Sequence, residues 1–189
     1  MKRWIATWVA ASMLLMAVSA MAAETENGIL INSTFDSIET YAKPADCSIN
    51  DNGNPVYAEV ETEGENKVLL LDCQRSEIVM DYALSDAPVN MISSANIRVD
   101  SCNAEFKVFL QKNSAGKFSG FLSYFPDGTI QSQDGRKVGT WKPGEWHQVV
   151  LAQNNKTRRY GISIDGKVKM TDALFENTSF GVPSVVRFQ

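Results

Sequence analysis

Three glutamates recur at every second position in one short stretch of the chain. Glu59, Glu61 and Glu63 alternate with small and apolar residues over 56–63, so they share one face of a predicted β-strand. Same-face neighbours on a strand lie about 6.5–7 Å apart, and the carboxylate pairs that cleave glycosidic bonds stand roughly 5–9.5 Å apart. The spacing therefore permits acid–base chemistry. Three like charges on a polar face are more typical of a solvated strand, and we interpret them so.

His147 is the single histidine of the chain. A histidine with a carboxylate partner can serve as a general base. It alternates, however, with Val149 and Leu151 in a strand-like run, which favours a structural place in a sheet. Nucleophilic serine chemistry of the hydrolase type needs a G-x-S-x-G turn, and the sequence contains none.

Four aromatic residues could contact a ligand, because aromatic faces stack on the CH groups of sugars. Trp141 precedes a turn, and we predict it as a ligand contact. Tyr124 and Phe125 point to opposite faces of a strand, so one of them is available for a ligand. Trp146 opens a strand, and we assign it to the core.

Asp127, Asp134 and Asp165 each precede a glycine. Oxygen-rich loops can hold calcium, but none of these aspartates has the spacing of a dedicated calcium loop. Asp-Gly is explained by turn geometry, because glycine accepts the positive φ of tight hairpin turns. We therefore expect no cofactor, with calcium as the alternative.

The elements that must position these residues are strands. Residues 118–167 alternate β-prone runs with Asp-Gly turns and with Lys142-Pro143-Gly144-Glu145, a type II turn pattern. Similar runs precede this stretch, including Val56–Glu63, Ile92–Asp100 and Glu105–Lys112. About ten short strands at such spacing predict an all-β protein, an antiparallel β-sandwich or jelly roll.

The N-terminus has the features of a secretory signal peptide. A basic start, an apolar run over 4–18 and the small-x-small triplet Ala20-Met21-Ala22 predict a signal peptide over residues 1–22 and one domain over 23–189. We expect the chain to be secreted, to the extracellular space or the periplasm, with no membrane insertion after signal removal. Removal of Lys2 and Arg3 leaves 16 of the 18 basic residues against 22 acidic ones, a net charge of −6. This charge argues against nucleic acid as a partner.

Export permits disulfide bonds. The three cysteines are Cys47, Cys73 and Cys102. Cys73 and Cys102 each follow a predicted strand, and we predict a bridge between them. Three free thiols are the alternative.

Trp146-His147-Gln148-Val149, followed by Tyr160 and the triplet Ile164-Asp165-Gly166, resembles the W-H-x-V … Y-x-x-x-(V/I)-D-G signature of concanavalin A-like lectin/glucanase and laminin-G-like domains. The resemblance covers residues 29–189 and implies a jelly roll. The fold hosts lectins, adhesion modules, hydrolases and lyases alike. Thr34–Ser37 resembles the opening strand of bacterial members. The chain ends inside a β-prone run, Val185–Gln189, so we expect a sandwich that lacks its last strand and is truncated at the C-terminus.

Arg75-Ser76-Glu77 resembles the start of the R-S-E-L-R motif of jelly-roll alginate lyases. The resemblance implies that Arg75 would neutralise a uronate carboxylate. Val79 stands where that motif has its second arginine, and the histidine and tyrosine segments of those lyases are missing. We retain Arg75 as a candidate ligand contact only.

The sequence thus predicts an exported, non-catalytic β-sandwich module that binds carbohydrate or an extracellular protein partner. The expected ligand contacts are Trp141, Tyr124, Phe125 and Arg75. A polysaccharide-active lyase or hydrolase is one alternative. A structural spacer attached to a catalytic region elsewhere is another.

Overall fold

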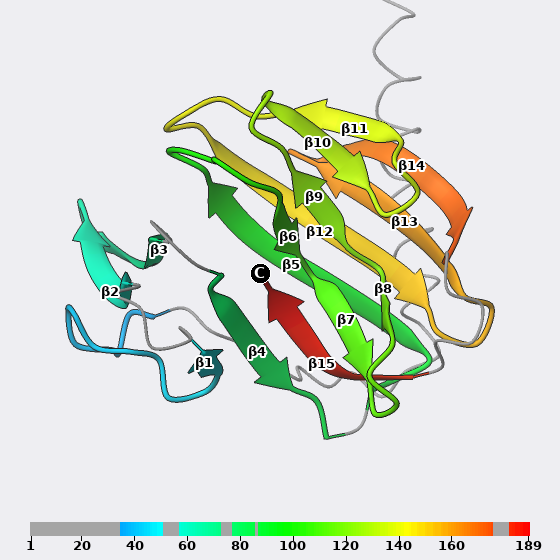
Figure 1. Ribbon diagram of the computed structural model, residues 1–189, viewed down its shortest axis with the longest axis horizontal. Coiled ribbons are helices and arrows are strands. Elements are labelled where there is room, and N and C mark those ends of the chain that lie inside the picture. The colour runs from blue at the N-terminus through cyan, green and yellow to red at the C-terminus, as the bar shows by residue number, and fades with distance from the viewer. Residues whose placement is uncertain (1–34, 51–56, 73–76, 86, 176–181) are drawn as a thin grey trace, which may run out of the picture.

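The computed structural model describes residues 35–50, 57–72, 77–85, 87–175 and 182–189 (Figure 1). The regular elements of these residues are all β-strands, which confirms the predicted fold class. The strands are β1 (Ser48–Asn50), β2 (Tyr57–Glu63), β3 (Asn66–Asp72), β4 (Val79–Ala83), β5 (Asn90–Arg98), β6 (Phe106–Val108), β7 (Leu110–Asn113), β8 (Phe118–Ser119), β9 (Leu122–Tyr124), β10 (Thr129–Ser132), β11 (Lys137–Thr140), β12 (Trp146–Asn154), β13 (Arg159–Ile164), β14 (Lys167–Leu174) and β15 (Pro183–Phe188).

All strands except β2 and β3, which form a separate two-stranded sheet, lie in two stacked layers (Figure 1). One layer is a single antiparallel sheet with the order β14-β13-β12-β5. The other, which we call the split layer, consists of the sheets β1-β4-β15-β7-β8 and β11-β10-β9-β6. Backbone hydrogen bonds between Lys107 and Gln189, of 2.6 and 3.0 Å, join these two sheets where β6 meets the end of β15.

The split layer is divided because two neighbouring strands break at the same level. Phe109 separates β6 from β7 with φ of 58°, and Gly120 separates β8 from β9 with φ of 61°. This left-handed region suits glycine but is unusual for phenylalanine. The sequence predicted one strand over 105–112, and the structure corrects this to two short strands.

The core lies between the layers and draws on both. The split layer contributes Val108, Leu122 and Ile130, and the opposite sheet contributes Val149 and Leu151, all with no exposed surface. Their alternation with polar residues along each strand is the pattern from which the sandwich was predicted.

The hairpin of β2 and β3 lies beside β1 and β4 in Figure 1. Leu71 of β3 packs against Ile78, which Ile49 also contacts, in a small cluster separate from the main core. The backbone of Val60 bonds to Tyr41 and Ala42 and so ties the hairpin to the preceding loop.

The β-prone run at the end of the chain forms β15, which lies inside the split layer and pairs with β4 on one side and β7 on the other. The expectation that a further strand follows remains a prediction. Within the predicted opening strand, Phe35 to Ser37 form a turn closed by a bond from Ile38 N–H to Phe35 O. The predicted signal peptide lies outside the described residues. None of the described residues forms a helix with the length and hydropathy needed to cross a membrane.

Candidate functional site

Trp141 and Tyr124, predicted as ligand contacts, are buried in the core. Trp141 is 8% exposed, and its Nε1–H donates to the carbonyl of Phe125 at 3.0 Å. Tyr124 is fully buried, and burial raises the pKa of its hydroxyl. Neither ring has a free face for stacking, so the structure corrects both assignments. The fold uses Trp141 to close the core beneath the turn after Phe125.

The other two predicted contacts give no ligand site. Phe125 is half-buried, and its backbone forms the turn before Thr129. Arg75 lies outside the described residues. The calcium candidate Asp127 accepts two hydrogen bonds from Thr129, at 2.9 and 2.6 Å, which also lower the pKa of Asp127. These bonds are the ones that the turn itself requires.

Trp146, assigned to the core from the sequence, is 46% exposed. The strand alternates, so His147, Val149 and Leu151 point inward while Trp146 and Gln148 point outward. Inward-facing Val149 and Leu151 could have shown this, because residues an odd number of positions away must face the other side. The two tryptophans thus exchange the roles that we predicted.

The outward-facing neighbours of Trp146 are sugar-compatible groups. Arg98 lies opposite it on β5, with its guanidinium carbon 5.2 Å from the centre of the indole ring. Asn96 and Gln148 form the next outward-facing pair, and both are exposed. An aromatic face with amide donors and acceptors beside it is the combination that sugar rings require. We call these four residues the Trp146 surface.

Acidic residues fix the position of Arg98. Its Nε lies 3.0 Å from Asp100 Oδ1, and Nη1 pairs with Glu63 from the β2–β3 hairpin. Hydrogen bonding to Asp100 raises the pKa of the Arg98 guanidinium. Because an arginine so held loses little freedom on binding, the Trp146 surface is largely pre-organised. Glu63, a member of the glutamate row, therefore has an ion-pairing role.

A recess of about 480 Å³ opens at the same end of β12. The polar and charged residues of its lining include Lys137, Lys142, Glu145, His147, Asp165 and Lys169. We call it the lysine recess. His147 Nδ1 lies 2.9 Å from Asp165 Oδ2, and the backbone N–H of Gln148 donates to Asp165 Oδ1 at 3.0 Å. The bond with His147 is the main cause of the lowered pKa of Asp165.

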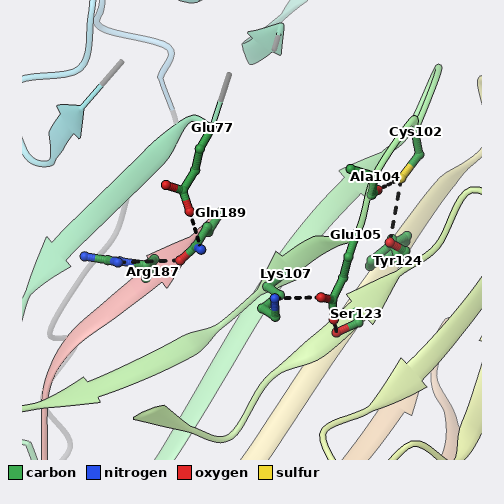
Figure 2. A network of polar contacts seen from close by, with 9 residues as sticks. All are labelled: Glu77, Cys102, Ala104, Glu105, Lys107, Ser123, Tyr124, Arg187 and Gln189. Carbon is green, nitrogen blue, oxygen red and sulfur yellow. Dashed lines mark hydrogen bonds and ion pairs between the residues drawn. The ribbon is translucent and has the colours of Figure 1, made fainter. Parts of the chain in front are cut away.

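The outer face of the split layer carries a charged network (Figure 2). Glu105 accepts a hydrogen bond from Ser123 at 2.6 Å and pairs with Lys107 at 2.7 Å. Gln189 donates to Glu77, the last residue of the lyase-like triplet, and Arg187 binds Asp81 through two bonds of 2.7 and 2.8 Å. Each charge of this network is met by a partner, as in a structural cross-link.

The cysteines and acids give no further site in the described part of the chain. Cys47 and Cys102 are free thiols, and Cys73 lies outside the described residues, so the predicted bridge has no support here. The Cys102 thiol donates to the carbonyl of Ala104 at 2.6 Å. Among the residues that the structure describes, no three histidines, cysteines or acids are grouped as a metal site would need.

No protein-family model and no curated protein matches this chain. Among solved structures, part of a sialidase is similar in fold, with a TM-score of 0.62 and 18% sequence identity. The alignment covers 84% of this chain and 14% of the sialidase, so the chain spans about a seventh of that protein's length. At this identity the likeness is one of fold.

Proposed function

We propose that this chain is an exported, non-catalytic β-sandwich module of the concanavalin A-like type that binds carbohydrate. The observation that carries the proposal is the Trp146 surface, where an exposed indole ring lies beside a held arginine and two exposed side-chain amides. Fold likeness to part of a sialidase, a protein that acts on carbohydrate, supports the choice of sugar over protein as the ligand.

The absence of catalytic geometry in the described residues supports a binding role. A glycosidase needs two carboxyl groups facing one bond, one of them free to give or take a proton. Here Glu63 pairs with Arg98, Glu105 with Lys107, and Asp165 with His147. The pKa values of Glu105 and Asp165 are lowered by their partners, which suits a binding surface better than proton transfer.

The proposal is tested by the retention of residues 23–189 on a glycan array and in polysaccharide affinity gels. Replacing Trp146 with alanine removes the stacking face, worth about 1–2 kcal/mol, so retention should fall five- to thirtyfold. Phe118→Ala is the matched control, because Phe118 is also an exposed aromatic, at 39%, but lies on the split layer.

Two results would contradict the proposal. Equal losses in the two variants, with circular dichroism unchanged, would show that the Trp146 surface is not the ligand site. Reducing ends or unsaturated uronate products released by the unaltered chain would show that the module is catalytic.

A further inference from the structure

The charges of the lysine recess are only partly paired. Glu145 pairs with Lys142 at 3.3 Å, and Asp165 is satisfied by His147 and the backbone of Gln148. The ammonium groups of Lys137 and Lys169 form no salt bridge within the described residues, but their charges help to lower the pKa of Asp127 and of Asp165, respectively. Two exposed lysines outside any salt bridge thus line one recess, in a protein whose overall charge is −4.

Two buried polar atoms near Asp165 have no hydrogen-bond partner in the described structure. His147 Nδ1 faces Asp165, whereas Nε2 is buried and has no hydrogen-bond partner in the described structure. The Tyr124 hydroxyl, which feels the charge of Asp165, is buried without a partner too. The negative groups of the recess are Glu145 and Asp165, which pair with Lys142 and with His147.

The formal charge of the lining selects the kind of anion. Three lysines against Glu145 and Asp165 give these five side chains a formal charge of +1. A single negative charge is therefore compensated, while a dianion such as phosphate would leave excess charge. The volume of about 480 Å³ is sufficient for one sugar ring.

We propose that the lysine recess binds the carboxylate of an acidic sugar, so that the ligand of this module is an acidic glycan. Lys137 and Lys169 contact the carboxylate, and His147 lies beneath it as a positioning residue through Asp165. The sugar identity rests on the proposed function. The recess and the Trp146 surface are both at the start of β12, so adjoining parts of one glycan could occupy them.

The test uses the single histidine as a reporter. In the labelled chain over residues 23–189, the imidazole nitrogen and carbon-bound proton signals of His147 are followed during titration with glucuronate. Glucose, which differs at C6, and sulfate are the two controls. We expect a saturable shift with glucuronate, none with glucose, and a weaker one with sulfate. A flat response to glucuronate, or one matched by glucose or sulfate, overturns the proposal.

Variants assign the response to the lysines. Lys137→Gln and Lys169→Gln should each weaken glucuronate binding about two- to fivefold, as expected for one exposed charge pair. Lys156→Gln is the matched control, an exposed lysine in the turn at the far end of β12. An equal loss in Lys156→Gln, or no loss in the two recess variants, contradicts the assignment.

The experiments distinguish failure of the proposal for the lysine recess from failure of the proposal for the Trp146 surface. If Trp146→Ala keeps full retention on glycans while glucuronate still shifts His147, the recess stands and the Trp146 surface does not. If Trp146→Ala loses retention on glycans but the signals of His147 do not shift with glucuronate, the Trp146 surface is the ligand site and the proposal for the lysine recess fails.

Discussion

Trp141 and Trp146 lie five residues apart and have opposite environments. The indole N–H of Trp141 is bound to the carbonyl of Phe125 within the core, and its backbone N–H bonds to Gly128 O at 2.9 Å. Trp146 is 46% exposed, and the guanidinium of Arg98 lies over its ring. One residue therefore closes the fold, and the other is free to recognise a ligand.

We expect Trp141→Phe to destabilise the domain without altering glycan retention. The substitution removes the donor to Phe125 O and leaves a small cavity, which together cost about 2–3 kcal/mol. Trp146→Phe, at an exposed site, should change the free energy of unfolding by no more than about 0.5 kcal/mol. Urea unfolding of both variants measures the difference, and similar values for the two would refute the assignment of Trp141 to the core.

Part of this contrast could be predicted from the sequence. Side chains alternate along β12, so Trp146 must face outward if Val149 and Leu151 face the core. This could have been predicted from the sequence. The burial of Trp141 could not be predicted, because it depends on how the turn from Phe125 to Gly128 packs against it. The lysine recess could not be predicted either, because Lys137 and Lys169 lie on strands of different layers.

At the scale of elements, β4 and β15 are held together by side chains as well as by backbone. Arg187 and Asp81 are cross-strand partners separated by 106 residues, and their side chains are 16% and 22% exposed. Bidentate pairs shielded from solvent are stronger than surface pairs. The guanidinium of Arg187 also lies 5.6 Å from the ring centre of Phe118 on β8, so it links three strands.

A double-mutant cycle on Arg187→Met and Asp81→Asn should give a coupling free energy of about 1–2 kcal/mol. The Lys142 and Glu145 pair, which is exposed and within one turn, should give less than about 0.5 kcal/mol in the same experiment. Thermal or urea unfolding of the single and double variants supplies both values. Coupling no larger at Arg187 than at Lys142 would mean that solvent screens both pairs alike.

The strand boundaries were predictable where alternation is regular and unpredictable where the backbone turns left-handed. Val56–Glu63 and Ile92–Asp100 correspond closely to β2 and β5. No local sequence pattern marks the strand break at Phe109, which lies beside the break at Gly120 in the neighbouring strand. A Cβ on Gly120 would lie 3.4 Å from the side chain of Gln111, which shows how closely the two strands approach there.

At the scale of the whole molecule, stability depends on carboxylates that the fold keeps ionised. Hydrogen bonds with Arg136 lower the pKa of Asp134, and that with His147 lowers the pKa of Asp165. For Glu105, burial acts to raise the pKa, but the bonds with Lys107 and Ser123 outweigh it and the net shift is downward. A carboxyl group whose pKa is lower in the folded state stabilises the protein at pH values above its unfolded pKa.

The midpoint temperature of thermal unfolding should therefore be constant above about pH 5. It should fall as the pH drops below about 4, because protonation of the carboxylates removes these bonds. The double variant Asp134→Asn and Asp165→Asn should begin with a lower midpoint and show a shallower fall. Calorimetry between pH 7 and pH 2 records both slopes. A double variant with the slope of the unaltered chain would show that other groups dominate acid unfolding.

The order of strands was the least predictable feature of the molecule. Alternation and Asp-Gly turns were sufficient for an all-β sandwich, because they are local. The position of β15 between β4 and β7 depends on contacts that span up to about 100 residues, and no local pattern encodes them.

That position has a consequence for how the chain is made. β7 is complete at residue 113, but its partner β15 begins at residue 183, so roughly 70 residues of synthesis separate them. At ~5–20 residues per second the ribosome needs several seconds to supply the missing strand. During this delay the split layer lacks β15 between β4 and β7, so the sandwich cannot form completely. If the chain is exported as proposed, its N-terminus emerges from the ribosome before β15 is made, so a translocation channel can engage the chain while it is unfolded.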